Sequence, residues 1–317
     1  MREYSMKSAI VTGPTGAVGS ALCAYLLEKG VRVYAVVRPG SKRVSNLPEG
    51  VSLVPCDLTQ MHRLRTLVPE GADVFFHLAW AHTIGAGRND MNAQIENIRY
   101  AVDAVQAASD LDCGVFVGAG SQAEYGRVEG KLTAQTPCFP ENGYGMAKLC
   151  AGEMTRVECA KHGLRHQWVR ILSVYGPHDT DRTMISMVIE KLLRREKPAL
   201  TEGLQQWDYL YAGDAAAALY SVACHGCDGR IYPVGSGQAR PLREYIEILR
   251  NQIDPSLPLG FGELPYSSGQ VMFLQADISS LTRDTGWAPR VAFEDGIRYT
   301  IENYRKTHLC LRLEDEK

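Results

Sequence analysis

The sequence has no long hydrophobic run, no large excess of charge of either sign and no evident metal-binding pattern. No apolar stretch approaches the roughly 18 residues that a membrane-spanning helix needs. The formal net charge of -2 gives no basic surface that would favour nucleic acid as a partner. We therefore expect neither a membrane protein nor a nucleic-acid-binding protein.

Nine cysteines are scattered along the chain, and only Cys224 and Cys227 form a C-x-x-C pair. No second Cys or His pair completes a zinc site, so we predict no metal and reduced thiols. Residues 1–6 lead straight into a strand-like run and lack the apolar core of a secretory signal. These features together predict a cytoplasmic protein.

Strand-like apolar runs alternate with segments of helical periodicity through the first half of the chain. The expected strands are 8–12, 31–37, 51–54, 74–79, 114–118 and 167–172, and the expected helices are 17–29, 92–108 and 144–161. Strands that are apolar along their whole length need cover on both faces. The pattern therefore predicts an α/β fold with a doubly wound parallel sheet, the Rossmann fold.

The second half is less regular, with a helix expected at 184–195 and Pro-rich segments after it. An Ala-rich helix at 213–223 and a strand at 230–235 are expected to return to the main sheet. We predict an NADP-binding domain and a smaller, interleaved substrate-binding lobe. The predicted bounds are 1–175 with 212–236 for the domain, 176–211 with 237–308 for the lobe, and 309–317 for a tail.

A glycine-rich segment joins the first expected strand to the first expected helix. It reads Gly13-Pro14-Thr15-Gly16-Ala17-Val18-Gly19. Glycines at these points permit a tight turn and bring the backbone close to a pyrophosphate, which then lies at a helix N-terminus. The predicted cofactor contacts are Gly13, Thr15, Gly16, Ala17, Val18 and Gly19.

Arg38 stands at the end of the second expected strand, where an acidic residue would bind the ribose 2′-hydroxyl of NAD. A guanidinium can hold a 2′-phosphate with two hydrogen bonds, and Ser41, Lys42 and Arg43 lie close enough in sequence to support it. The alternative is a solvated basic loop. We predict NADP as the cofactor, with NAD less favoured.

Tyr144 and Lys148 form a Y-x-x-x-K pair, which places both side chains on one face of a helix. An ammonium group beside a phenol favours its ionised form, so the pair suits proton transfer. Upstream, just past the fifth expected strand, the chain reads Gly120-Ser121-Gln122-Ala123-Glu124-Tyr125-Gly126.

Together, the G-x-x-G-x-x-G loop, the Ser121 segment and the Tyr144–Lys148 pair resemble the extended short-chain dehydrogenase/reductase family. Members of that family act largely on nucleotide-sugars. The resemblance implies that Ser121 binds the reacting oxygen beside Tyr144, with Lys148 completing the catalytic set. It further implies cofactor contacts from Asp57, Leu58, Leu78, Ala79, Tyr144 and Lys148, and substrate contacts from Ser121, Gln122 and Ser173. The family also pairs two long helices into a homodimer, which 92–108 and 144–161 would form here.

The chain departs from the family pattern after Ser121. Dehydratases of the family carry Asp-Glu there as acid and base, whereas Gln122 and Ala123 cannot ionise. Reduction and epimerisation remain. Because a net reductase consumes its hydride and draws on NADPH, Arg38 favours an NADPH-dependent reductase of a nucleotide-activated 4-keto-sugar. The alternative is a nucleotide-sugar 4-epimerase with tightly bound NAD(P).

Both arginines that the family uses for the substrate diphosphate are missing. Trp207 stands at one of the positions and 267–270 contains no arginine at the other. Arg182, Lys191 and Arg240 are candidate replacements, while Trp207 could stack on the substrate or pack in the core. This departure keeps open a reductase of a non-nucleotide ketone. A cofactor-sensing protein without chemistry is disfavoured, because Ser121, Tyr144 and Lys148 are all retained.

Overall fold

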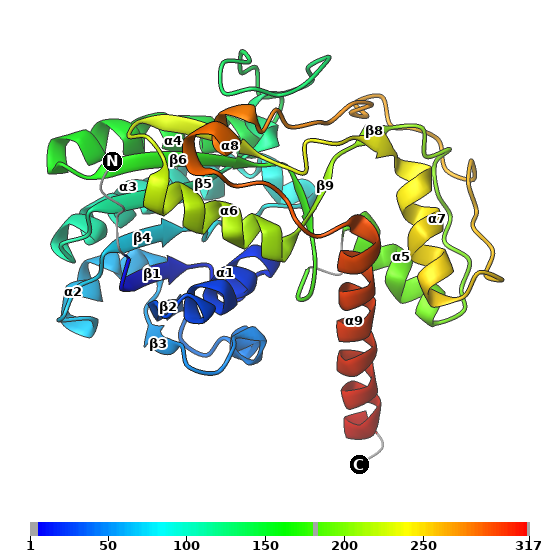
Figure 1. Ribbon diagram of the computed structural model, residues 1–317, viewed down its shortest axis with the longest axis horizontal. Helices are drawn as coiled ribbons and strands as arrows, with labels where there is room; N and C mark the ends of the chain where they lie inside the picture. Colours follow the sequence, from blue (N-terminus) through cyan, green and yellow to red (C-terminus); the bar gives the residue numbers. More distant parts are fainter. Residues whose placement is uncertain (1–5, 180–182, 316–317) are drawn as a thin grey trace.

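The computed structural model describes residues 6–179 and 183–315, with side chains described as far as residue 306. Its centre is a seven-stranded sheet of parallel strands in the order β10-β6-β5-β4-β1-β2-β3 (Figure 1). The strands are β1 (Ser8–Thr12), β2 (Arg32–Val37), β3 (Ser52–Pro55), β4 (Val74–His77), β5 (Val115–Ser121), β6 (Arg165–Ile171) and β10 (Arg230–Val234). The order reverses between β1 and β4. In sheets of this kind, ligands bind at the carboxyl ends of the strands beside such a reversal.

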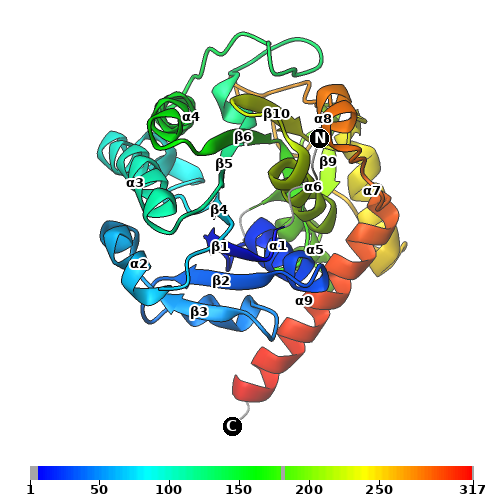
Figure 2. The same ribbon diagram turned by 60° about the vertical axis from the view of Figure 1, so that its left-hand side comes forward.

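Helices cover both faces of this sheet, as Figure 2 shows. On one face lie α1 (Ala17–Glu28), α6 (Ala212–His225) and α8 (Ser279–Thr285), and on the other lie α2 (Leu64–Leu67), α3 (Met91–Asp110) and α4 (Gly143–His162). Neighbouring residues of β1 enter different cores, with Ala9 and Val11 against the first face and Ile10 against the second. Cover on both faces explains why the interiors of strands such as β1 and β4 are apolar at successive positions instead of alternating with polar residues.

The second half of the chain builds a smaller lobe beside the carboxyl ends of the strands (Figure 1). It contains α5 (Met184–Leu193), α7 (Leu242–Ile253), α9 (Phe293–Asp315), and the paired short strands β7 (Ser173–Tyr175) with β9 (Tyr209–Tyr211) and β8 (Gln206–Trp207) with β11 (Arg240–Pro241). The three helices pack on a separate core that includes Val188, Leu249 and Ile297. None of the described helices is long and apolar enough to cross a membrane.

The strands and helices predicted for the first half are all present, with ends displaced by a few residues. The strand expected at 114–118 runs to Ser121, so the serine ends β5 itself. Gly30 follows the C-cap Lys29 of α1 and has a φ of +74°, the left-handed conformation that ends many helices. Helices α7 and α9 were not predicted; α7 buries Tyr245, Ile246 and Leu249, an interval typical of one helix face.

Candidate active site

The glycine-rich loop lies where β1 passes into α1, and two of its glycines are required by close packing. A Cβ on Gly13, whose φ is +68°, would lie 2.8 Å from the backbone nitrogen of Ala79, beside Leu78. A Cβ on Gly19 would lie 2.2 Å from the carbonyl oxygen of Gly13. The loop therefore folds tightly against itself and against the end of β4, which brings the predicted cofactor residues of both segments together.

Gly16 has a different environment, and it provides the test of whether an anionic cofactor fits. It is the N-cap of α1 and provides no side-chain hydrogen bond, while the first turn contains no acidic residue. A Cβ at Gly16 would find no atom nearer than the Gly13 oxygen at 3.9 Å. The N-terminus of α1 is thus open and uncapped, as a pyrophosphate-binding helix end needs to be.

Arg38 follows β2 as an exposed side chain, and the backbone N–H of Ser41 donates to its carbonyl oxygen at 3.1 Å. Asp57 is the N-cap of the short helix η2 (Leu58–Arg63), where its carboxylate accepts from the backbone and hydroxyl of Thr59. These hydrogen bonds, together with the charge of Arg38, lower the pKa of Asp57. An exposed cation and an ionised carboxylate therefore lie at the edge formed by β2 and β3.

Ser121 ends β5 and begins the short helix η4 (Gln122–Glu124). Its hydroxyl accepts from the backbone N–H of Ala123 at 3.2 Å, while its own N–H donates to Glu124 at 2.7 Å. This reciprocal capping box fixes the backbone and side chain of Ser121. Gln122 lies beside it and is half-buried.

Helix α4 begins with Asn142 as its cap and packs directly on η4. Asn142 accepts from the backbone N–H of Gly145 at 2.9 Å. A Cβ on Gly145 would lie 2.3 Å from the carbonyl oxygen of Ala123, so only glycine permits this approach. The contact brings Tyr144 next to Ser121, and the two hydroxyls share a hydrogen bond.

Lys148 lies one turn further along α4 and is buried. Its ammonium donates to the carbonyl oxygen of Ala119 at 2.5 Å and lies 3.8 Å from the centre of the Trp80 ring. Burial lowers the pKa of Lys148 to about 7, although the Glu124 carboxylate opposes this. The buried lysine therefore gives up its proton more readily than an exposed lysine.

Tyr144 keeps its proton more firmly than a free tyrosine. Burial raises its pKa, and the hydrogen bond with Ser121 and the charge of Arg88 oppose the rise. The ammonium of Lys148 is 6.0 Å from the centre of the Tyr144 ring. The sequence predicted that Lys148 would lower the pKa of the Tyr144 phenol, and this needs correction. Burial of the phenol raises its pKa more than Ser121 and Arg88 lower it, and burial also lowers the pKa of Lys148.

Comparison with known proteins agrees with this geometry. Residues 9–235 match the model of the NAD dependent epimerase/dehydratase family. The chain belongs to this family. The low-salt glycan biosynthesis protein Agl12 of Haloferax volcanii is 26% identical over 310 residues, which cover 93% of this chain and 97% of that protein. The dTDP-glucose 4,6-dehydratase of Neisseria meningitidis is 23% identical over 335 residues, covering 94% and 93%.

Solved structures give the same fold. The UDP-N-acetylglucosamine 4-epimerase of Methanobrevibacter ruminantium superimposes with a TM-score of 0.86 at 21% identity, covering 96% of this chain and all of that chain. The UDP-glucose 4-epimerase of Thermus thermophilus, solved with NAD, gives a TM-score of 0.83 at 22% identity, covering 94% and 99%. The family match together with this fold makes the chain an extended short-chain dehydrogenase/reductase, an NAD(P)-dependent enzyme of the oxidoreductase/epimerase type.

Glu124 is the acidic side chain nearest in sequence to Ser121, but in this protein it is shielded from solvent. It is fully buried and accepts from Arg170 Nε at 2.6 Å and from the indole N–H of Trp168 at 3.0 Å. Arg170 also lies over the ring of Tyr125, with its guanidinium carbon 4.5 Å from the ring centre. The carboxylate is thus part of a buried ion pair and is not free to act as acid or base.

In the smaller lobe, Trp207, which stands where the family has an arginine, contacts Ser173, a predicted substrate residue. The Trp207 indole N–H donates to the Ser173 hydroxyl at 2.8 Å. Arg240, a candidate phosphate ligand, is paired instead with Glu294 at 3.0 Å. Lys191 lies half-buried in the last turn of α5, and Arg182 lies outside the described residues.

A cavity of about 270 Å³ lies in this lobe. Its lining residues are Met184, Met187, Ala199, Leu200, Thr201, Gln205, Trp207, Tyr209, Leu242, Ile246, Leu264 and Gln270. The side-chain oxygen of Gln205 is buried and has no hydrogen-bond partner among the described residues. Trp207 therefore both packs in the lobe and faces a cavity, and Gln205 leaves an acceptor available.

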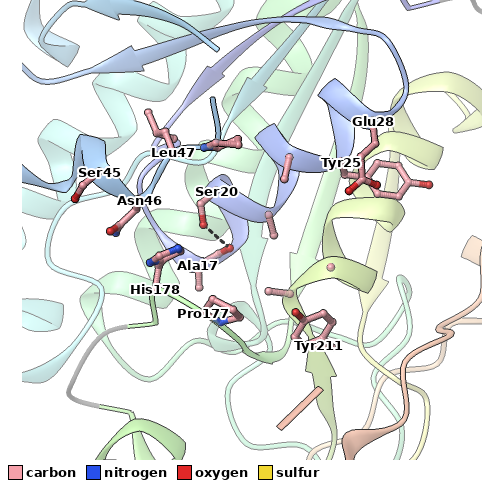
Figure 3. Close-up of a pocket in the computed structure, with 15 residues that line it drawn as sticks. Ala17, Ser20, Tyr25, Glu28, Ser45, Asn46, Leu47, Pro177, His178 and Tyr211 are labelled. Atoms are coloured by element: carbon pink, nitrogen blue, oxygen red, sulfur yellow. Dashed lines mark hydrogen bonds between the residues drawn. The ribbon is translucent and has the colours of Figure 1, made fainter. Parts of the chain in front are cut away.

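A second cavity, of about 530 Å³, lies along α1, between this helix and residues 177–178 and 211–213 (Figure 3). It is bordered by Ala17 and Ser20 of α1, by Asn46, by His178 near the start of the smaller lobe, and by Tyr211 at the end of β9. Ser121, Tyr144 and Lys148 do not line it. It is therefore distinct from the Ser–Tyr–Lys group.

Two residues of the site, Trp80 and Arg88, were not predicted from the sequence. Trp80 meets Tyr144 edge to face, with ring centres 6.2 Å apart, and Arg88 lies over the Tyr144 ring. The sequence feature that could have indicated them is a pair of amides on α3, Gln94 and Asn97. Both are buried, and they bind the segment that contains Trp80. The described residues contain no group of three or more His, Cys, Asp or Glu side chains that could hold a metal.

Proposed function

We propose that this protein is an NADPH-dependent reductase of a nucleotide-activated keto-sugar, with a 4-keto-hexose as the favoured substrate. Known relatives include a dTDP-glucose dehydratase, and structures with the same fold include UDP-sugar epimerases, which support a nucleotide-sugar substrate. The proposal assigns cofactor binding to the Rossmann domain and substrate binding to residues 176–211 and 237–308.

The observation that carries the choice of NADPH is the position of Arg38. Its exposed guanidinium follows β2, where the ribose of a bound dinucleotide lies in Rossmann folds. A 2′-phosphate would be attracted by this cation, whereas the acidic residue that selects NAD is absent at this position. The open N-terminus of α1 would hold the pyrophosphate, and Leu78, Ala79, Asp57 and Leu58 would border the cofactor.

Ser121, Tyr144 and Lys148 would carry the proton transfer. When bound, the nicotinamide supplies hydride to the carbonyl carbon. Ser121 would hold the carbonyl oxygen, and Tyr144 would give that oxygen its proton, so that the ketone becomes a secondary alcohol. Lys148 would hold the ribose of the cofactor and assist the return of a proton to Tyr144. Because Tyr144 keeps its proton at neutral pH, it is suited to act as the donor.

The surroundings of Ser121 argue against water elimination. Gln122 and Ala123 cannot ionise, and the Glu124 carboxylate is occupied by Arg170 and Trp168. A dehydratase needs a separate acid and base beside the sugar. Reduction needs no such pair: besides the hydride of the cofactor, it needs only the proton that Tyr144 would supply.

The cavity of about 270 Å³ in the smaller lobe supports the proposal that the substrate is activated by a nucleotide. It combines apolar walls, the face of Trp207 and the unpartnered oxygen of Gln205, a composition suited to a flat heterocycle with a hydrogen-bond donor. A nucleoside base meets this description. The diphosphate would then require cations other than Arg240, which is committed to Glu294.

The first experiment is calorimetric titration of the purified protein with NADPH and with NADH. We expect at least tenfold tighter binding of NADPH, about 1.4 kcal/mol, and loss of most of this preference in Arg38→Asp. Arg65→Asp is the matched control, because Arg65 is an exposed arginine of α2 whose guanidinium is paired with Asp112 at 2.9 Å. Equal binding of the two cofactors would contradict the proposal, and protein purified with NAD already bound would favour a 4-epimerase.

We also propose a homodimer built on α3 and α4. Their outer surface carries exposed apolar side chains, namely Met91, Ile95, Met146, Met154 and Val157. Neighbouring helices with such a surface are typical of an interface between subunits. Light scattering at micromolar concentration should give twice the mass of the 317-residue chain; a monomer would exclude this arrangement.

A further inference from the structure

The connection from β4 to α3 passes across the N-terminal end of α4. It includes the short helix η3 (Gly85–Asn89). The side-chain oxygen of Asn89 accepts from the backbone N–H of Gly143 at 3.0 Å. A Cβ on Gly143 would lie 3.0 Å from the carbonyl oxygen of Arg88, so glycine permits the close approach. The connection is thus held directly beside Tyr144.

Two buried amides of α3 hold the rest of this connection. Asn97 exchanges two hydrogen bonds with the backbone of Ala81, each 3.0 Å long. Gln94 donates to the carbonyl oxygens of His82 and Gly87 at 3.2 Å and accepts from the Trp80 indole at 2.9 Å. Both amides are about 2% exposed. Buried amides whose hydrogen bonds are satisfied in this way make a loop rigid.

Arg88 is carried by this rigid segment onto the face of Tyr144. Its guanidinium carbon is 4.8 Å from the centre of the Tyr144 ring. Its Nε atom is buried and has no hydrogen-bond partner in the described part of the chain. A buried guanidinium nitrogen without a partner is costly, so its retention beside Tyr144 calls for a function.

The other ionisable groups around Tyr144 are less suited to stabilise a phenolate. Lys148, on the same helix, donates to the Ala119 carbonyl oxygen and lies 6.0 Å from the centre of the Tyr144 ring, and burial lowers its pKa. His77, at the end of β4, stays neutral because burial and Lys148 lower its pKa to about 3. Glu124, in η4, is negative and paired with Arg170. A guanidinium, in contrast, remains charged at every pH at which a protein is folded.

We propose that Arg88 is a positioning residue for Tyr144, whose guanidinium stabilises the phenolate that remains after proton transfer. This rests on the proposed role of Tyr144 as proton donor. Arg88 would set the pH range over which Tyr144 can give up its proton and recover it. Lys148 would then serve mainly in cofactor binding and proton return.

The test is a titration of Tyr144 in the cofactor-free protein. Phenolate absorbance is measured against pH as the difference between each protein and its Tyr144→Phe counterpart, which removes the signal of the other tyrosines. Replacing Arg88 with Met, which keeps a similar apolar stem, should raise the pKa of Tyr144 by about one unit or more, a tenfold change in proton affinity. Arg88→Lys keeps a charge and should shift the pKa by less than half as much.

The matched control is Arg99→Met, because Arg99 lies over the ring of its neighbour Tyr100 on the exposed side of α3, with its guanidinium carbon 5.4 Å from the ring centre. This variant should leave Tyr144 unchanged. If Arg88→Met does not fold, as judged by circular dichroism, Arg88→Gln takes its place. A Tyr144 pKa that stays within a few tenths of a unit of the unmodified protein, or an equal shift in the Lys variant, would overturn the proposal.

The titration is independent of turnover, so the two proposals can fail separately. If Tyr144→Phe kept full activity, the proposed function would be wrong, while the titration would still decide what Arg88 does. If Tyr144 proves essential, the high-pH limb of the kcat profile provides a second readout. A reductase needs Tyr144 protonated, so this limb should move to higher pH by the same amount in Arg88→Met as the titration does.

Discussion

The buried pair of Glu124 and Arg170 gives the sharpest prediction about stability. Both side chains are almost completely buried, and Arg170 Nε donates to Glu124 at 2.6 Å. Glu124 also accepts from the backbone of Ser121 and from the indole of Trp168. In Glu124→Gln, the amide can still accept from Ser121 and Trp168, but its NH2 group would face the Arg170 donor.

This change leaves a buried guanidinium without a counter-charge. Breaking a buried ion pair on one side typically costs about 3–5 kcal/mol, so we expect the free energy of unfolding to fall by about 3 kcal/mol or more. Arg170→Met should destabilise by a similar amount, since it leaves the carboxylate unpaired. The double variant should recover part of the loss, with a coupling energy of about 2 kcal/mol.

Urea unfolding followed by circular dichroism measures these differences. The matched control is Glu141→Gln, which breaks the Arg127–Glu141 pair of similar length, 2.8 Å, with both side chains about half exposed. An exposed pair contributes about 0–1 kcal/mol, so this variant should unfold close to the parent. If Glu124→Gln and Glu141→Gln cost the same, or if the two single losses simply add in the double variant, the reasoning about the buried pair is wrong.

Three further predictions follow from the site. Tyr144→Phe should abolish turnover and leave NADPH affinity within about twofold of the parent protein; calorimetry and a steady-state assay measure both, and residual activity near the parent level would exclude Tyr144 as the donor. Lys148→Met should increase stability at neutral pH. Because burial lowers the pKa of Lys148 from 10.5 to about 7, the folded state binds fewer protons than the unfolded state between these values. The stability of the parent therefore rises with pH across this window, and the advantage of the Met variant in urea unfolding should shrink from pH 7 to pH 10; a constant difference would contradict this. Gly19→Ala should lower the midpoint of thermal unfolding by several degrees, because its Cβ would lie 2.2 Å from the Gly13 oxygen, whereas Gly16→Ala, with open space at that position, should unfold normally and weaken NADPH binding only.

The periodicity of the sequence was sufficient for the central sheet. The interiors of strands such as β1 and β4 are apolar at successive positions because they are covered on both faces, and this pattern is visible without coordinates. Motif spacing was likewise sufficient for the glycine-rich loop and for the Tyr144–Lys148 pair, since a turn and a single helix are local structures. The helices α7 and α9 were missed, because they lie in the lobe where irregular segments interrupt the pattern.

Only the tertiary structure revealed which groups surround Tyr144. Arg88 is 56 positions away along the chain, and it reaches Tyr144 because Gln94, Asn97 and Asn89 fix the connection that carries it. Glu124 follows Ser121 closely in sequence, yet its pairing with Arg170 depends on the alignment of β5 with β6. The pKa values of Tyr144 and Lys148 depend on burial, which residue spacing does not report. The sequence by itself determined which residue types form the Ser–Tyr–Lys site. Long-range packing decided the pKa values of these residues, because desolvation depends on what surrounds a group in space.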